Sequence, residues 1–141
     1  MHNKLLLSIM ATVIFFSIGC KSDPVTAPVV DPGTPTPSFN IASVTANCTG
    51  TNDCIQFWAT PNADVLLVKV EIKYPVTGGT TYNFGSATVV RDQSVALQAA
   101  GIAYTRISGQ WTFTFTGQYA AGEHSGKGFV ATATVTVGAK L

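Results

Sequence analysis

The feature that most constrains this chain is a repeated alternation of apolar and polar residues with a period of two. From Trp111 to Tyr119, aromatic residues occupy one side of the alternation and threonines the other. The same pattern runs from Phe129 to Val137, where threonine recurs at positions 132, 134 and 136. In a β-strand, successive side chains point to opposite faces, and β-branched and aromatic residues favour that conformation. We therefore expect two long strands, each with one buried face.

Further segments show the same alternation. Between residues 66 and 74, we expect the apolar set to face the core and the charged set to face solvent; the apolar set is Leu66, Val68, Val70, Ile72 and Tyr74, and the charged set is Lys69, Glu71 and Lys73. The other expected strands are Phe39–Asn47, Cys54–Thr60, Thr80–Phe84, Ala87–Val90 and Gln93–Gln98. No segment shows a helical stripe, although the alanines between Ser94 and Ile102 would tolerate a helical turn.

Seven or eight short strands within residues 39–141 predict an all-β, two-sheet antiparallel sandwich, with a small barrel as the alternative. The segment Ser108–Gly117 and the closing strand Gly128–Val137 resemble the immunoglobulin-like and fibronectin type III-like modules of exported bacterial proteins. The resemblance implies an immunoglobulin-like sandwich. The Cys…Trp…Cys spacing of antibody domains is absent, because Cys48 and Cys54 are too close together.

The N-terminus reads as a secretory signal peptide over residues 1–19. Lys4 supplies the positive charge, an apolar run extends from Leu5 to Ile18, and the small residue Gly19 precedes Cys20. The run is too short to predict a membrane-spanning helix. Residues 17–20 resemble the lipobox of bacterial lipoproteins, although Ser17 replaces the usual leucine. The resemblance implies cleavage before Cys20, acylation of that cysteine and a stable lipid anchor. An ordinary signal peptide with a chance cysteine, or an uncleaved helix, is the alternative.

The residues after Cys20 predict the membrane in which the anchor lies and an extended linker. In many lipoproteins of Gram-negative bacteria, aspartate directly after the acylated cysteine favours the inner membrane, so the resemblance and Lys21 imply the outer membrane. The stretch Lys21–Asp23 also resembles surface-export signals of Bacteroidetes-type lipoproteins, so the anchor could face the periplasm or the cell surface. Five prolines between positions 24 and 37 predict an extended linker, residues 20–38, before the domain at 39–141.

The net charge of the chain limits the classes of partner that we expect. The chain has eight basic and seven acidic residues, and removal of Lys4 with the signal peptide leaves a formal net charge of zero. Without a basic patch, nucleic acid is not an expected partner.

Cys48 and Cys54 form an even pair in an exported chain, which predicts a disulfide. A zinc site is the alternative, but the two further ligands that it needs are missing.

Candidate chemistry is sparse. Glu123, His124 and Lys127 lie in a glycine-rich hairpin loop, Ala120–Lys127, where they could bind a ligand or simply keep the loop soluble. Asn52, Asp53 and Asp64 do not match a calcium-ligand spacing. The sequence contains no recognisable pairing of a nucleophile with an orienting base. We therefore expect no catalytic residues, no metal and no cofactor, and we expect that the chain is not an enzyme.

Two surfaces could instead bind a partner. Trp58 shares the polar side of its strand with Gln56 and Thr60, so it could stack on a sugar or anchor a protein, unless a loop, the linker or a register break buries it. The two threonine rows could form a polar docking surface or merely stabilise the sheet.

Taken together, these features predict a lipid-anchored, non-enzymatic module at the cell envelope, which binds a ligand there or acts as a spacer for other domains. The alternatives are a carbohydrate-binding module that uses Trp58 with Tyr74 or Tyr82, and a subunit of a surface assembly.

Overall fold

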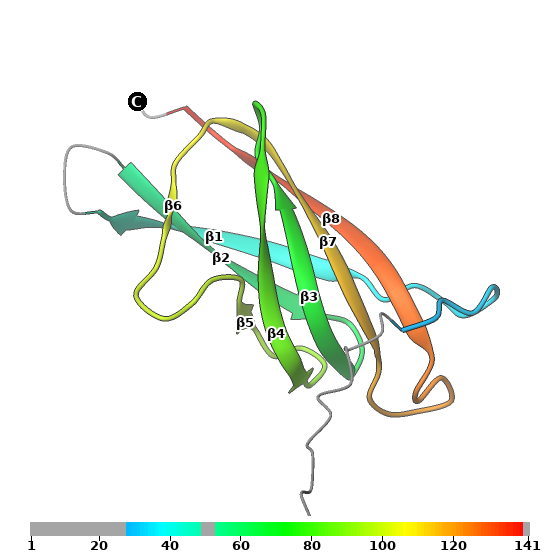
Figure 1. Cartoon of the computed structure of the whole chain (residues 1–141). Helices are drawn as coiled ribbons and strands as arrows, with labels where there is room; N and C mark the ends of the chain where they lie inside the picture. Colours follow the sequence, from blue (N-terminus) through cyan, green and yellow to red (C-terminus); the bar gives the residue numbers. More distant parts are fainter. Residues whose placement is uncertain (1–27, 49–52, 140–141) are drawn as a thin grey trace, which may run out of the picture.

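The computed structural model describes residues 28–48 and 53–139, and within them the chain is an antiparallel two-sheet β-sandwich of eight strands (Figure 1). One sheet contains β1 (Phe39–Asn47), β2 (Asp53–Pro61), β5 (Val95–Ala96) and β6 (Tyr104–Thr105). The other has the order β4 (Gly79–Val89), β3 (Val65–Lys73), β7 (Gly109–Tyr119) and β8 (Gly128–Val137). The predicted sandwich is thereby confirmed. No helix in these residues is long and apolar enough to cross a membrane. The predicted signal peptide and Cys20 lie outside the described residues.

The core lies between the inner faces of β2, β3 and β7. Phe57 of β2 is fully buried, and its ring centroid lies 4.8 Å from that of Trp111 and 5.0 Å from that of Phe113, both on β7. Nearer the start of β1, Phe39 stacks on Phe115 with centroids 4.0 Å apart. Residues of the predicted inward side of β7 are all buried, as the period-two pattern requires. Burial of these large rings supplies most of the hydrophobic driving force for the fold.

The strand predictions are confirmed in outline, and they differ from the structure where the backbone is irregular. The strand expected at Phe39–Asn47 is found with those bounds. The two strands expected at Thr80–Phe84 and Ala87–Val90 are one strand, β4, which continues through Gly85 and Ser86 with positive φ angles of 62° and 64°. The break that the sequence suggests is therefore a local distortion of one strand.

A bulge in β3 overturns the predicted inward positions of Leu66 and Val68. The register of β3 against β7 shifts between Leu67 and Lys69, which leaves Val68 as an extra residue. Leu67 is therefore fully buried, whereas Leu66 and Val68 are only partly buried. The predicted alternation holds from Lys69 onward, because beyond the bulge the register is regular again.

The strand expected at Gln93–Gln98 is reduced to the two residues of β5. The backbone amide of Leu97 still donates to the carbonyl of Phe57, but the next bond uses a side chain. The buried Gln98 accepts a hydrogen bond of 3.1 Å from the backbone N–H of Phe57 through its Oε1 atom. Its side chain thus satisfies a strand amide that a longer β5 would satisfy with its backbone.

The connection from β5 to β7 contains β6, which the sequence analysis missed. The hydroxyl of Tyr104 donates a hydrogen bond of 2.6 Å to the carbonyl oxygen of Leu97. This bond ties β6 back to the connection that follows β5. Beside β6 in the same sheet, Cys48 and Cys54 form the predicted disulfide, with Cα atoms 5.7 Å apart.

Candidate functional site

The outer face of the β4–β3–β7–β8 sheet carries cross-strand rows of polar side chains, which we call the threonine face. The two threonine rows that the sequence shows lie side by side on this face, because Thr112 lies opposite Thr134 and Thr114 opposite Thr132. Thr116 instead faces Val130, and Thr136 faces Gln110. The pairing continues into β3 and β4 and gives two rows: Thr81, Glu71, Thr114, Thr132, and Gly79, Lys73, Thr112, Thr134.

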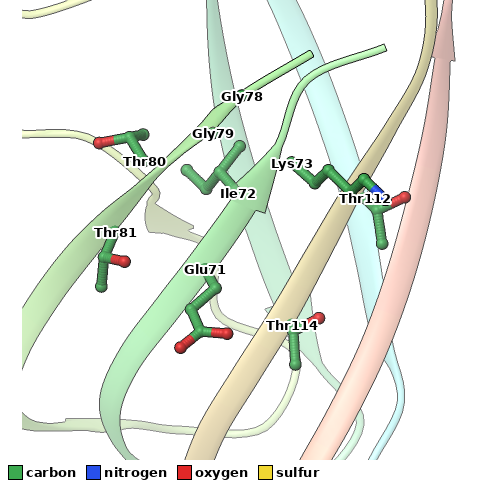
Figure 2. A pocket seen from close by; sticks show the side chains of 9 residues that line it. All are labelled: Glu71, Ile72, Lys73, Gly78, Gly79, Thr80, Thr81, Thr112 and Thr114. Atoms are coloured by element: carbon green, nitrogen blue, oxygen red, sulfur yellow. The ribbon is translucent and has the colours of Figure 1, made fainter. Parts of the chain in front are cut away.

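A hollow of about 360 Å³ lies on this face where β3 and β4 approach their connecting turn, and we call it the polar hollow (Figure 2). Side chains from three strands line it, and Gly78 and Gly79 add only backbone; the lining side chains are Glu71, Ile72, Lys73, Thr80, Thr81, Thr112 and Thr114. A Cβ atom at Gly79 would lie 2.4 Å from the carbonyl oxygen of Ile72. Glycine is therefore required there, and its missing side chain leaves the hollow open beside Lys73.

The charges of the threonine face follow a Lys–Glu–Lys pattern along β3. Lys69 forms an ion pair with Glu71, two residues away on the same face. Lys73 forms no ion pair with the residues that the structure describes. The polar hollow therefore presents hydroxyl groups, one carboxylate paired with Lys69 and one ammonium group, all of which can form hydrogen bonds.

A second hollow, of about 340 Å³, lies on the inner side of the same turn and is lined by Tyr74, Tyr104, Thr105, Ile107 and Trp111. We call it the aromatic hollow. The ring of Trp111 is fully buried, and its Nε1 donates a hydrogen bond of 2.9 Å to the carbonyl of Ile107. The ring centroids of Tyr74 and Tyr104 lie 5.3 Å and 6.1 Å from that of Trp111. Desolvation by burial, with Tyr74 and Tyr82 nearby, raises the pKa of Tyr104 to about 12.

Both hollows lie at one end of the sandwich, which we call the turn end. A further hollow, beside the disulfide, lies there too and is lined by Asn47, Cys48, Gly101, Ile102 and Ala103. The pairing of Cys54 with Thr105 holds this region against β6. The aromatic hollow, lined by both Tyr74 and Thr105, thus connects the end of β3 with the part of β2 that carries the disulfide.

The described part of the predicted linker, residues 28–38, is fixed to the opposite end, which we call the linker end. Val30 forms a parallel bridge with Gly128 at the start of β8, and Asp31 forms an ion pair of 3.2 Å with Lys127. The Tyr119 hydroxyl donates a hydrogen bond of 2.7 Å to the carbonyl of Pro35. These contacts join the linker to β7, β8 and the loop between them.

Of the predicted ligand-binding residues, Glu123, His124 and Lys127 all lie in the β7–β8 loop at the linker end. Glu123 is exposed, His124 lies with its ring centroid 5.5 Å from that of Tyr119, and Lys127 is engaged by Asp31. Residues 28–48 and 53–139 contain no group of three or more His, Cys, Asp or Glu side chains that could hold a metal ion. The structure brings these three residues close to the linker rather than to the hollows.

Trp58 lies on the outer face of the other sheet and is half-buried. Its neighbours across the strands are Ala42 on β1 and Ala96 on β5. The register of β1 against β2 runs without a break, so the alternative that a register break turns Trp58 inward is wrong. Tyr74 and Tyr82 pack against the core from the opposite sheet, so neither joins Trp58 in a common site.

The aromatic hollow is the part of the site that the sequence analysis missed. Tyr104 lies outside every predicted strand, and its partners Tyr74 and Trp111 are distant in the sequence. The one local signal was Tyr104 itself, because a large ring with a polar tip in a connection between strands often has a packing role.

Comparison with known proteins identifies no relative: no family model, no curated protein and no solved structure matches the chain. The functional assignment therefore depends on the site alone.

Proposed function

We propose that this chain is a lipid-anchored, non-enzymatic binding module of the bacterial cell envelope that meets its partner at the turn end. The observation that carries the proposal is the separation of the linker contacts from the hollows. The linker is fixed beside Gly128 and Tyr119, whereas the hollows lie at the other end of the same strands.

The proposed lipid anchor determines which of the two ends lies nearer the membrane. Acylation at Cys20 would leave seven residues before Pro28, and the eight Cα–Cα steps from Cys20 to Pro28 span at most about 28 Å. A membrane at the far end of that tether would lie nearer the linker end than the turn end. The turn end would then be presented to the surroundings, on a rigid sandwich that positions its loops.

The first test of the anchor is mass spectrometry of the native protein after expression in its own host. Acyl chains on Cys20 at a new N-terminus support the proposal. An unmodified Cys20, or a retained signal peptide, overturns it.

The orientation is tested by photo-crosslinking in intact envelopes, with a photoreactive amino acid placed at either of two exposed positions. Position Thr134 reports on the turn-end half of the threonine face, and Ser125 in the β7–β8 loop is its matched control at the linker end. Crosslinks to a partner from position 134 but not from 125 support the proposal. Crosslinks confined to position 125 would move the binding site to the loop with Glu123, His124 and Lys127.

A subunit of a surface assembly is the second candidate function, favoured by the edges of the sandwich. The edge strands β1 and β8 contain no charged residue and no proline, the features by which edge strands usually resist pairing. Val44 on β1 is 55% exposed. An uncharged edge of this length can add a strand from a partner.

Sedimentation of the delipidated chain over a range of concentrations tests this alternative. Assembly through β1 predicts a concentration-dependent increase in mass that Val44→Lys abolishes. Val90→Lys, at an exposed valine that lies outside β1 and β8, is the matched control. A monomer at every concentration removes self-association through an edge from consideration.

A further inference from the structure

We infer that the aromatic hollow is a subsite for one ring of a neutral sugar. The inference rests on the proposed function, since it names the ligand class that the turn end of the binding module would take. Three observations support it: the volume of the hollow, its lining and the state of its hydroxyl groups.

The volume fits a single ring. At about 340 Å³, the hollow lies near the lower limit of small-molecule sites in proteins, roughly 300–1,000 Å³. It therefore suits one compact group rather than an extended chain. Further rings of an oligosaccharide would leave the hollow and follow the surface.

The lining is aromatic and uncharged. Tyr74 and Tyr104 are half-buried and offer ring surface, and the fully buried indole of Trp111 lies behind them. The bond from Trp111 Nε1 to Ile107 and the bond from the Tyr104 hydroxyl to Leu97 hold two of the three rings in place. A preformed aromatic wall of this kind suits the apolar face of a sugar ring, and the absence of charge in the lining selects a neutral ligand.

The hydroxyl groups that line the hollow favour a sugar over a purely apolar ligand. Within the described residues, the hydroxyls of Tyr74 and Thr105 form no hydrogen bond, unlike that of Tyr104. An aliphatic side chain in the hollow would remove water from these hydroxyls without replacing its hydrogen bonds. The hydroxyl groups of a sugar ring would replace them. The threonine hydroxyls of the polar hollow, across the β3–β4 turn, extend the same chemistry outward.

The experiment is an NMR titration of the full mature chain with neutral trisaccharides of glucose, xylose and mannose, and with a trigalacturonate as the charged comparison. The chain has two tryptophans, so two indole N–H signals report in one sample. Trp111 lies beneath the hollow, and Trp58, on the other sheet, is the internal control. We expect a neutral trisaccharide to shift the Trp111 signal and leave the Trp58 signal in place.

Tyr74→Phe keeps the ring and removes the hydroxyl, and we expect it to weaken binding about three- to tenfold. Tyr82→Phe is the matched control, because Tyr82 packs nearby on β4 but does not line the hollow. A shift of Trp58 alone, tighter binding of the trigalacturonate, no shift with any neutral sugar, or equal effects of the two variants would overturn the inference. If the sugars fail while crosslinks from position 134 still capture a partner, only this inference falls. If the sugars bind but crosslinks come only from position 125, the proposed orientation falls instead.

Discussion

The hydroxyl of Tyr104 donates a hydrogen bond of 2.6 Å to the carbonyl oxygen of Leu97, and this bond fixes the connection between β5 and β7. Tyr104→Phe removes the bond and leaves the Leu97 carbonyl without its partner. We expect the free energy of unfolding to fall by about 1–2 kcal/mol. Urea denaturation measures the change. Tyr82→Phe, whose hydroxyl has no hydrogen bond in the described residues, should change it by less than about 0.5 kcal/mol. Equal losses in the two variants would contradict a role for the bond.

The raised pKa of Tyr104 predicts a loss of stability at high pH. Burial and two neighbouring tyrosines raise this pKa from 10.0 to about 12. Because the unfolded chain ionises first, the contribution of the neutral hydroxyl is complete below pH 10 and is lost as the pH rises towards 12. Urea denaturation across this range should show a falling free energy of unfolding. In Tyr104→Phe the fall should be smaller, with a remainder from Tyr119, whose pKa burial also raises. An unchanged slope in the variant would refute the assignment.

The disulfide between Cys48 and Cys54 should stabilise the domain by about 2 kcal/mol, because it closes a loop with a sequence separation of 6. Urea denaturation of the native chain with and without reductant measures this difference. The double variant Cys48→Ala/Cys54→Ala should match the reduced protein and show no response to reductant. If reductant leaves the free energy of unfolding of the native chain unchanged, the strand pairing of β1 and β2 alone stabilises the ends of these strands.

The contact between the linker and β8 depends on a glycine. A Cβ atom at position 128 would lie 2.6 Å from the carbonyl oxygen of Val29 and 2.8 Å from Cβ of Pro28. Gly128→Ala should therefore displace residues 28–30 and make the linker easier to cleave in limited proteolysis. Gly138→Ala is the matched control, because a Cβ atom there has no neighbour within 4 Å. Equal cleavage of both variants would indicate that the linker does not depend on this contact.

The sandwich could be predicted because its alternation is regular along the strands that form the core. The faces of β7 and β8 follow from a period of two alone, and the threonine rows follow from their pairing. The pattern failed at Val68, because a bulge inserts one residue and exchanges the faces on either side of it. A bulge depends on the neighbouring strand, and the sequence of β3 carries no local sign of it.

The candidate site was less predictable for a related reason. The polar hollow combines predicted threonines with Gly79, whose importance depends on the nearby carbonyl of Ile72. The aromatic hollow joins Tyr74, Tyr104 and Trp111, which only the packing of the two sheets brings together. The contacts of residues 28–38 could not be predicted either, since a proline-rich composition indicates an extended chain but not what it touches.

The neighbours Phe57 and Trp58 test the orientation of β2 most directly, because they point to opposite faces. Phe57 is fully buried among the rings of Trp111, Phe113 and Tyr104, so Phe57→Ala should lower the free energy of unfolding by about 3–5 kcal/mol. Trp58 is half-buried between two alanines on the outer face, so Trp58→Ala should cost roughly 1 kcal/mol. Thermal and urea denaturation of both variants measure the difference. A loss in Trp58→Ala as large as that in Phe57→Ala would mean that another segment covers the outer face of this sheet.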